Sequence, residues 1–244
     1  MTRHAIFILT ASLSLTACSN QTADKSRIEK TSVDSSSTTS FTADTSKQFS
    51  ITNATADDFT KAENKYKDKI LYDTTTIRKK GNTIKLSTDN GGLTLTDTLV
   101  ETDETAIREY QYYGQFPSIS CYIIYEQYYE GSQYILVNKH SGKQTVIWNK
   151  PKLSPSDKFV ANLSLMLGME GIPNGMQIWS IDKNDHTVNK FIEIDQQNWA
   201  PYNFYWETDS SLIINVNEAS VEKFYDSNGD LNTKDSYFLR LTIK

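Results

Sequence analysis

Two seven-residue stretches of the sequence align at a shift of 44 residues: Leu136-Val-Asn-Lys-His-Ser-Gly142 and Ser180-Ile-Asp-Lys-Asn-Asp-His186. Each is the end of an apolar strand-like run that leads into a polar turn. A second apolar run follows each turn, at Thr145 to Trp148 and at Val188 to Ile194. The sequence therefore predicts two copies of one strand-turn-strand unit.

A second pair of stretches supports the repeat. Leu153-Ser-Pro-Ser-Asp-Lys-Phe-Val-Ala161 aligns with Trp206-Glu-Thr-Asp-Ser-Ser-Leu-Ile-Ile214 at a shift of 53 residues, and each is a turn that begins an apolar strand. A period of about 40 to 50 residues with three or four strands per cycle is typical of β-propeller blades. We expect the last apolar stretch, Tyr237 to Ile243, to begin a further cycle.

The first member of this pair resembles a known family motif. Pro151-Lys-Leu-Ser-Pro-Ser-Asp-Lys-Phe-Val-Ala161, with a Ser-Gly-Lys turn before it, is similar to the Ser-Pro-Asp-Gly-Lys blade motif of the periplasmic TolB-type β-propellers. Ser156-Asp157 stands where the motif has Asp-Gly, and the second copy keeps neither the proline nor the glycine. The resemblance covers residues 119 to 217. It implies a mainly β, propeller-like domain of about four blades and a partner in the cell envelope; the alternative is a β-sandwich or an open meander.

The N-terminus has the features of a bacterial export signal. Arg3 precedes an uncharged run from Ala5 to Ala17, which is too short to span a bilayer. Leu15-Thr-Ala-Cys18 closes this run and resembles the lipobox of bacterial lipoproteins, in which the signal is cut before the cysteine and the cysteine is acylated. We expect residues 1–17 to be a signal peptide and Cys18 to carry the lipid; the alternative is an ordinary secretory signal.

Residues 18–55 are expected to form a tether. Between Ser19 and Ala56, 17 of 38 residues are Ser or Thr, and large apolar side chains are few. Such a segment does not bury enough surface to offset the entropy lost on ordering. The folded, β-rich domain is therefore expected to span residues 56–244.

Local patterns within this domain predict one helix followed by strands. Thr55-Ala-Asp-Asp58 is typical of a helix N-cap with acids in the first turn, and Phe59, Ala62 and Tyr66 recur at helical spacing. Asn90-Gly91 lies between the alternating runs 83–87 and 93–96, which predicts a β-hairpin. The expected fold is thus mainly β with one short N-terminal helix.

Charge and cysteine content exclude some functions. The 25 Lys and Arg residues against 30 Asp and Glu give a net charge of -5, so a nucleic-acid partner is not expected. If Cys18 carries lipid, Cys121 is left as a lone thiol in the apolar run Ile119 to Tyr125, where a cysteine usually acts as a small buried hydrophobe. We expect no disulfide and no catalytic role for Cys121.

Catalytic and metal-binding signals are weak. His140 and His186 fall in turns 46 residues apart with no second histidine at a spacing that suits a metal. Carboxylates near Glu101 to Glu109 indicate a solvated loop. One calcium-loop candidate has oxygen ligands at alternating positions, namely Asp226, Asn228, Asp230 and Asn232. A plain Asn-Gly turn explains the same residues, and we expect no other cofactor.

Aromatic residues gather in two regions. Eight of the fourteen tyrosines lie between Tyr110 and Tyr134, and a second group spans Trp199 to Trp206. We expect most of these side chains to lie in the core, since both alternating faces of residues 121–129 are apolar, which indicates a strand covered on both sides. A subset is expected to form a partner-binding rim: Tyr112, Tyr113, Tyr128, Tyr129, Trp199 and Tyr202.

These features together predict a lipoprotein of the bacterial cell envelope, anchored by lipid on Cys18 at the outer membrane and facing the periplasm. The expected function is non-catalytic binding of an envelope protein through loops on one face of the scaffold. Two alternatives remain: a periplasmic inhibitor or immunity lipoprotein, and a glycan-binding protein or glycan hydrolase. A hydrolase requires two carboxylates in an aromatic-lined cleft, about 5 to 10 Å apart.

Overall fold

The computed structural model describes residues 48–73, 75–99, 104–165, 173–218 and 236–244, all within the unit Ala43–Lys244. Cys18 and the calcium candidates Asp226, Asn228, Asp230 and Asn232 lie outside the described residues. No helix in the described ranges is long and apolar enough to cross a bilayer.

The described strands form four antiparallel sheets, which we number in chain order. Sheet 1 contains β2 (Thr83–Thr88) and β3 (Gly91–Thr96). Sheet 2 contains β4 (Arg108–Phe116), β5 (Cys121–Tyr128), β6 (Gly131–Asn138) and β7 (Gln144–Ile147). Sheet 3 contains β8 (Lys152–Leu153), β9 (Phe159–Ser164), β10 (Gly175–Ile181) and β11 (Val188–Asp195). Sheet 4 contains β12 (Trp199–Trp206), β13 (Ser211–Glu218), β14 (Tyr237–Ile243) and β1 (Phe49–Ala54).

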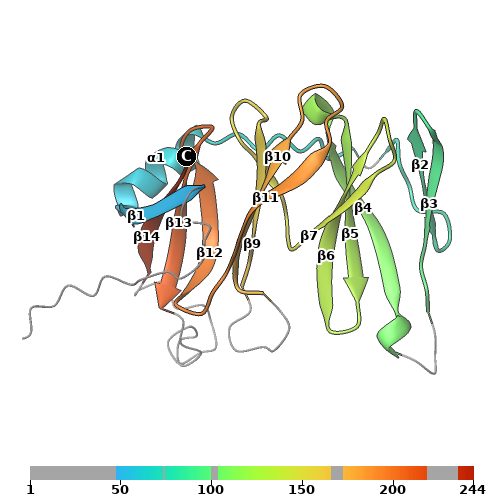
Figure 1. Ribbon diagram of the computed structural model, residues 1–244. Coiled ribbons are helices and arrows are strands. Elements are labelled where there is room, and N and C mark those ends of the chain that lie inside the picture. The colour runs from blue at the N-terminus through green and yellow to red at the C-terminus, as the bar shows by residue number, and fades with distance from the viewer. Residues whose placement is uncertain (1–47, 74, 100–103, 166–172, 219–235) are drawn as a thin grey trace, which may run out of the picture. The chain divides into compact units, whose positions relative to one another are not determined.

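The sheets pack in chain order, each against the next (Figure 1). One apolar cluster, which includes Ile84 and Ile124, joins sheets 1 and 2. A second, which includes Phe116 and Val160, joins sheets 2 and 3, and a third, around Trp206, joins sheets 3 and 4. Strand β5 therefore has apolar cover on both faces, which confirms the prediction from residues 121–129. The described strands form four sheets with three apolar cores between them, and not the two facing sheets of a β-sandwich.

The 44-residue repeat is present in the backbone hydrogen bonds. The Asn138 side-chain oxygen accepts from the amides two and three residues ahead, at 2.8 and 2.9 Å, and Asp182 does the same at 2.7 and 3.4 Å. The amides of Gly142 and His186 close the two turns onto the carbonyls of Asn138 and Asp182. Both closing residues have positive φ, 75° and 56°. The two hairpins are therefore equivalent turns of sheets 2 and 3.

The departure from the blade motif at Asp157 has a structural explanation. Asp157 has a φ of 61°, in the left-handed region that glycine favours and that Asp tolerates better than most residues. Its amide donates to the Ser154 carbonyl at 3.1 Å, which closes a tight turn before β9. Asp157 thus occupies the position of the motif glycine and keeps the backbone conformation that the turn requires.

The boundary of the folded domain lies earlier than predicted. Strand β1, which falls inside the expected tether, pairs with β14 over six residues, from Phe49 opposite Ile243 to Ala54 opposite Phe238. Phe49 and Ile51 pack against the core between sheets 3 and 4. The count of serines and threonines hid this alternation of apolar residues, so the boundary at residue 56 is wrong.

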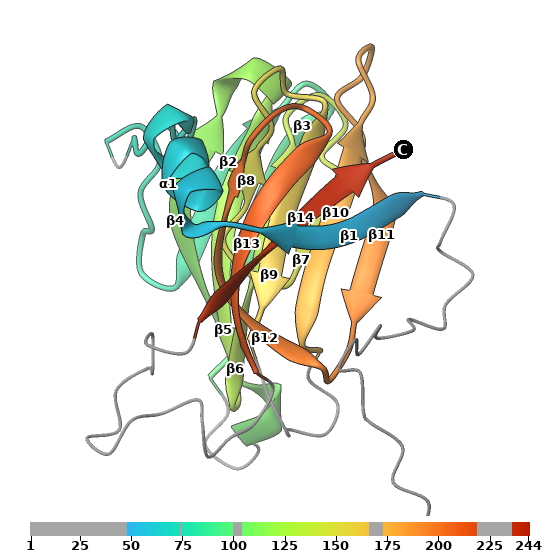
Figure 2. The same ribbon diagram turned by 90° about the vertical axis from the view of Figure 1, so that its left-hand side faces the viewer.

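Strand β14 completes a sheet and does not begin a new cycle, so that prediction is also wrong. It lies between β13 and β1, and Figure 2 views the fold from this side, with β1 beside β14. The chain segments at the two ends of the described region are thereby held in one sheet by backbone hydrogen bonds. The fourth strand of sheet 4 therefore comes from the N-terminal side of the described region.

The predicted helix and hairpin are both confirmed. Helix α1 (Ala56–Lys65) begins at Thr55, whose hydroxyl accepts from the Asp58 amide while the Asp58 carboxylate accepts from the Thr55 amide, a reciprocal capping box. Short 3-10 turns occur at Glu104–Ala106 and Pro117–Ile119. In the first hairpin Thr88 pairs with Gly91, so Asp89 and Asn90 form the loop and Gly91, with φ 112°, leads out of it.

Candidate functional site

Residues 66–72, here called the crossing segment, leave helix α1 and run along the first strands of three sheets. Lys65, just before it, donates to the carbonyl of Glu207 at the end of β12. Lys69 donates to the Ser154 carbonyl after β8 at 3.0 Å and to the Asp157 carboxylate at 2.6 Å. Leu71 forms a β-bridge with Gln115 of β4. The segment therefore covers the edges at which the chain enters sheets 4, 3 and 2.

The crossing segment fits closely against β4 because of Gly114. A Cβ at this position would lie 2.8 Å from both the Ile70 side chain and the Leu71 carbonyl oxygen. Gly114 has a φ of 155° and sits at an irregularity in the pairing of β4 with β5. Ile70 is buried in the core between sheets 2 and 3, so this close approach holds the crossing segment in place.

Side chains of the crossing segment and two neighbouring segments form a cluster, here called the tyrosine-lysine surface: Asp68, Leu71, Tyr72, Tyr113 and Lys150. The first three are exposed, and Tyr113 and Lys150 are partly buried. Leu71 and Tyr72 are 50% and 49% exposed. The Tyr72 hydroxyl donates to Asp68 at 2.7 Å and accepts from the Lys150 ammonium at 2.8 Å. Lys150 also lies 3.3 Å from Asp68 and 5.5 Å from the centre of the Tyr72 ring. The exposed tyrosine is thus fixed by two hydrogen bonds, to two side chains that also pair with each other.

A row of tyrosines connects this surface to the core. The Tyr72 ring meets Tyr113 edge-on at 5.7 Å, Tyr113 meets Tyr134 at 5.1 Å, and Tyr134 meets Tyr125 at 5.4 Å. Such edge-to-face pairs contribute about 0.5–1.5 kcal/mol each beyond the area they bury. Tyr134 is 8% exposed, so the row joins an exposed ring to a buried one. These ring contacts therefore restrain Tyr72 through packing that reaches the core.

The charges at the surface are mutually stabilised. Burial alone would raise the pKa of Asp68, but hydrogen bonds from the Ile70 amide and Tyr72 and the charge of Lys150 outweigh it and lower that pKa. Burial raises the pKa of Tyr72 to about 12. The pKa of Lys150 is raised, because its contacts with Tyr72 and Asp68 outweigh partial burial. At neutral pH Asp68 and Lys150 are charged and Tyr72 is a neutral hydrogen-bond donor.

A half-buried lysine, Lys152, lies next to Tyr66 of the crossing segment. The Lys152 ammonium is 3.9 Å from the centre of the Tyr205 ring and 4.9 Å from that of Phe204. It donates to the Asn203 side chain at 2.8 Å and to the Phe204 carbonyl at 2.7 Å. Burial, followed by the charge of Lys150, lowers the pKa of Lys152 to about 8. The aromatic contacts and two acceptors give this cation a structural role between β8 and β12.

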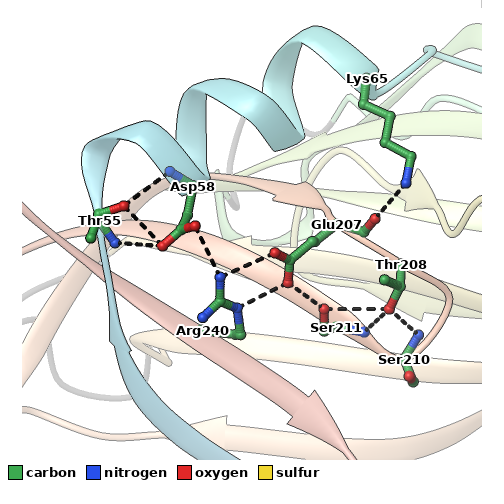
Figure 3. A network of polar contacts seen from close by, with 8 residues as sticks. All are labelled: Thr55, Asp58, Lys65, Glu207, Thr208, Ser210, Ser211 and Arg240. Carbon is green, nitrogen blue, oxygen red and sulfur yellow. Dashed lines mark hydrogen bonds and ion pairs between the residues drawn. The ribbon is translucent and has the colours of Figure 1, made fainter.

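A polar network fixes helix α1 on sheet 4 (Figure 3). Arg240 of β14 donates to both carboxylate oxygens of Glu207, at 2.9 and 3.1 Å, and lies 3.3 Å from Asp58 of the helix cap. Glu207 also accepts from the Ser211 hydroxyl at 2.7 Å. The network positions the start of the crossing segment, because that segment continues directly from α1.

The structure separates the residues predicted to bind a partner. Tyr113 belongs to the tyrosine-lysine surface, and Tyr129 is 41% exposed on a turn of sheet 2. Tyr112 and Tyr128 are partly buried, Tyr112 against the core between sheets 1 and 2 and Tyr128 under the Arg108 guanidinium. The Tyr202 hydroxyl accepts from Asn217 at 3.0 Å.

The prediction that Trp199 belongs to a partner-binding rim is wrong. This side chain is 2% exposed and belongs to the core between sheets 3 and 4, so it cannot contribute to a surface rim. Trp199 begins β12, and the next residue, Ala200, is fully buried, so both faces of the strand are covered at this end. Sequence alternation alone did not distinguish this face from the exposed one.

The histidines and Cys121 occupy defined places. The His140 and His186 rings lie 5.9 Å apart, and His140 is 2.5 Å from Asp89, so turns of three sheets meet here. Within the described part of the chain, no three His, Cys, Asp or Glu side chains are placed to hold a metal ion. Cys121 is fully buried, as predicted, and burial raises the pKa of its thiol to about 12. This thiol is protonated at neutral pH and is a poor nucleophile.

The carboxyl groups with clearly shifted pKa values all shift in one direction. Among the described residues, every carboxyl whose pKa shifts clearly is shifted downward: Asp58, Asp68, Asp73, Asp185, Glu193, Glu207 and Asp209. A glycosidase needs one carboxylic acid with a raised pKa as proton donor. These seven groups are ionised at neutral pH and are suited to salt bridges and turns.

Sequence reasoning missed most of the tyrosine-lysine surface. Leu71, Tyr72 and Lys150 lie outside the two aromatic regions, and only Tyr113 was expected. The available signal was the stretch Tyr66-Lys-Asp-Lys-Ile-Leu-Tyr72, which mixes large apolar side chains with charges directly after a helix. No protein-family model, curated protein or solved structure matches the chain in the comparisons made.

Proposed function

We propose that this protein is a non-catalytic binding module of the bacterial cell envelope, and that the tyrosine-lysine surface is where it holds a partner protein. The observation that carries this proposal is the pair Leu71 and Tyr72, two large side chains about half exposed and fixed by the contacts of Tyr72 with Asp68 and Lys150. Rigid aromatic anchors with a polar tip are favoured at protein interfaces because little entropy is lost when they are buried.

The scaffold is proposed to be propeller-like, with three four-stranded blades and one two-stranded blade. Three features favour blades: the chain enters sheets 2, 3 and 4 at an edge strand, successive sheets pack face to face, and β1 completes the last sheet. In such scaffolds the working surface is carried by loops and edges on one side. The crossing segment lies along these entry edges, which is why we place the partner there.

The membrane attachment is proposed from the sequence. Lipid on Cys18 and the segment between Cys18 and β1 would hold the domain near the outer membrane, facing the periplasm. The partner is proposed to be an envelope protein with an apolar pocket for Leu71 and Tyr72, rimmed by charges that match Asp68 and Lys150.

A quantitative capture experiment tests the proposal. The full-length chain, with a C-terminal tag, is expressed in a bacterial envelope, solubilised in mild detergent and used as bait. The bait must include β1, which begins at Phe49, because this strand completes sheet 4. We compare the wild type with Tyr72→Ser and with Tyr237→Ser; Tyr237 is 40% exposed on β14 and serves as a matched control.

The expected result is one strongly enriched envelope protein, with recovery about tenfold lower for Tyr72→Ser and unchanged for Tyr237→Ser. A tenfold loss corresponds to about 1.4 kcal/mol, at the lower end for an aromatic anchor. Equal recovery with both variants would remove the tyrosine-lysine surface as the binding site. If no protein is enriched by the wild type, protein binding itself is wrong.

A further inference from the structure

A hollow lies on sheet 1, and its lining begins at Thr75, shortly after Tyr72 in the chain. It has a volume of about 770 Å³ and opens between the turn after the crossing segment and the start of β2. Its described lining residues are Thr75, Thr76, Ile77, Arg78, Lys80, Thr83 and Lys85. We propose that this hollow binds a phosphate-bearing carbohydrate, with the cations holding the phosphate. This inference does not depend on the protein partner proposed above.

The charge of the lining favours a dianion. Arg78, Lys80 and Lys85 are exposed, and within the described residues none of them forms an ion pair. Lys79 in the same turn differs, because it is paired with Asp97. These three cations, which have no ion-pair partner among the described residues, give the hollow a positive charge, whereas the whole chain has a net charge of -5. One carboxylate would neutralise only one of them, whereas a phosphate monoester carries close to two negative charges.

The side-chain chemistry points to the same ligand class. Arginine offers a planar set of donors that matches two phosphate oxygens, and lysines add point charges around it. The hydroxyl groups of Thr75, Thr76 and Thr83 already donate to Asp73 and Asn82, and their remaining lone pairs offer acceptors for the hydroxyl groups of a polyol or sugar. Ile77 is the one apolar residue in the described lining, and no aromatic ring there offers a stacking platform for a nucleobase.

The walls of the hollow are formed by ordered backbone. On one side, the Asp73 carboxylate accepts from the amides of Thr75 and Thr76 at 3.0 and 3.1 Å. These hydrogen bonds and those of the threonine hydroxyls lower the pKa of Asp73, the nearest acid along the chain, and engage its charge. On the other side, Thr83 and Lys85 alternate with the buried Ile84, so both project from the face of β2 opposite the core.

The volume of the hollow suits a ligand larger than a bare ion. Small-molecule sites in proteins are commonly about 300–1,000 Å³, and 770 Å³ is far more than one phosphate group fills. The remaining space is lined by hydroxyl groups and the stems of long cationic side chains, which suits a hydrated sugar. The phosphate group would therefore provide the charge recognition and the carbohydrate would fill the rest.

Titration calorimetry on the full-length chain in detergent tests this inference, with glucose 6-phosphate as the probe and glucose and inorganic phosphate for comparison. The test variant is the double substitution Arg78→Gln and Lys85→Gln. The control is Lys143→Gln and Lys183→Gln, which removes the same charge from exposed lysines in the turns of sheets 2 and 3. All four side chains are exposed, and circular dichroism confirms that each variant is folded.

We expect the wild type to bind glucose 6-phosphate and not glucose. The test variant should bind glucose 6-phosphate at least about tenfold more weakly, and the control variant should change this affinity less than about twofold. Affinity should fall as salt is raised, because the contact is charge-dependent. Equal affinity of the wild type and the test variant would overturn the site. Tighter binding of inorganic phosphate than of the sugar phosphate would overturn the carbohydrate part.

A second arm separates a soluble carbohydrate from a lipid headgroup. Vesicles of phosphatidylglycerol in phosphatidylcholine are offered to the full-length chain, with and without glucose 6-phosphate as competitor. We expect the competitor to remove any binding that depends on Arg78 and Lys85. Vesicle binding that is lost in the test variant but not reduced by the sugar phosphate would show that the hollow recognises a lipid surface and would contradict the inference.

Discussion

The contact between Arg240 and Glu207 gives a prediction that the structure makes quantitative. Two hydrogen bonds, of 2.9 and 3.1 Å, join the guanidinium to both carboxylate oxygens, and the side chains are 28% and 32% exposed. Fully exposed ion pairs typically contribute 0.2–1 kcal/mol, and hydrogen bonds to charged groups about 1.5–3 kcal/mol. Because this pair is bidentate but partly solvated, we expect a coupling energy of about 1–2 kcal/mol.

A double-mutant cycle measures this coupling. Arg240→Met, Glu207→Gln and the double variant are compared with the wild type by equilibrium urea unfolding of the full-length chain. The matched control is a cycle on Lys61 and Asp57, both in helix α1. These two side chains are 2.6 Å apart and each is 72% exposed. We expect no measurable coupling in the control, since solvent screens that pair.

The coupling between Arg240 and Glu207 should also depend on pH. The hydrogen bonds from Arg240 lower the pKa of Glu207 below its ordinary value of 4.5. The stabilisation is therefore present above pH 4.5 and is lost as the pH falls through the lower pKa of the folded state. A coupling no larger than that of the control pair, or one that persists after Glu207 is protonated, would refute the account of how α1 is fixed to sheet 4.

Two further predictions concern the interior. Gly175→Ala should lower the free energy of unfolding by more than about 3 kcal/mol or prevent folding, because the new Cβ would lie 2.0 Å from the Ile194 carbonyl oxygen at a φ of 148°. Gly81 has a φ of 59° and nothing within 4 Å of an added Cβ, so Gly81→Ala should lower the free energy of unfolding by only about 1 kcal/mol. Similar unfolding midpoints for both variants in urea would contradict the packing described for β10. Lys152 should make the wild type more stable as pH rises from about 8 to 10.5, because the unfolded lysine still holds its proton there and the folded one does not. Lys152→Met should abolish this rise, of up to about 3 kcal/mol, and an unchanged pH slope in urea unfolding would show that Lys152 is not desolvated.

Local signals in the sequence predicted the parts of the fold that local chemistry determines. The turns at Asn138 and Asp182 were found because short polar side chains that bond their own backbone leave a recognisable pattern. The cap at Thr55 was found for the same reason. The hairpin of sheet 1 was also predicted, although the positive φ falls on Gly91 alone and not on both Asn90 and Gly91.

Features that depend on distant partners were missed. Strand β1 is stabilised by β14, almost 190 residues later in the chain, and its serines and threonines are typical of a tether. Trp199 and Tyr202 read alike in sequence, yet one is in the core and the other on a strand face with Asn217. The tyrosine-lysine surface joins Tyr72 to Lys150 across 78 residues, and no local pattern reports such a contact.

The central claim is that Tyr72 is part of a protein-binding surface, and site-specific photo-crosslinking in living cells tests it most directly. Benzoylphenylalanine is placed at position 72 of the full-length chain, or at position 237 as a control of similar exposure, and the cells are irradiated before the envelope is solubilised. We predict one discrete crosslinked product from position 72 and none of that mass from position 237. No product from position 72, or the same product from both positions, would contradict the claim.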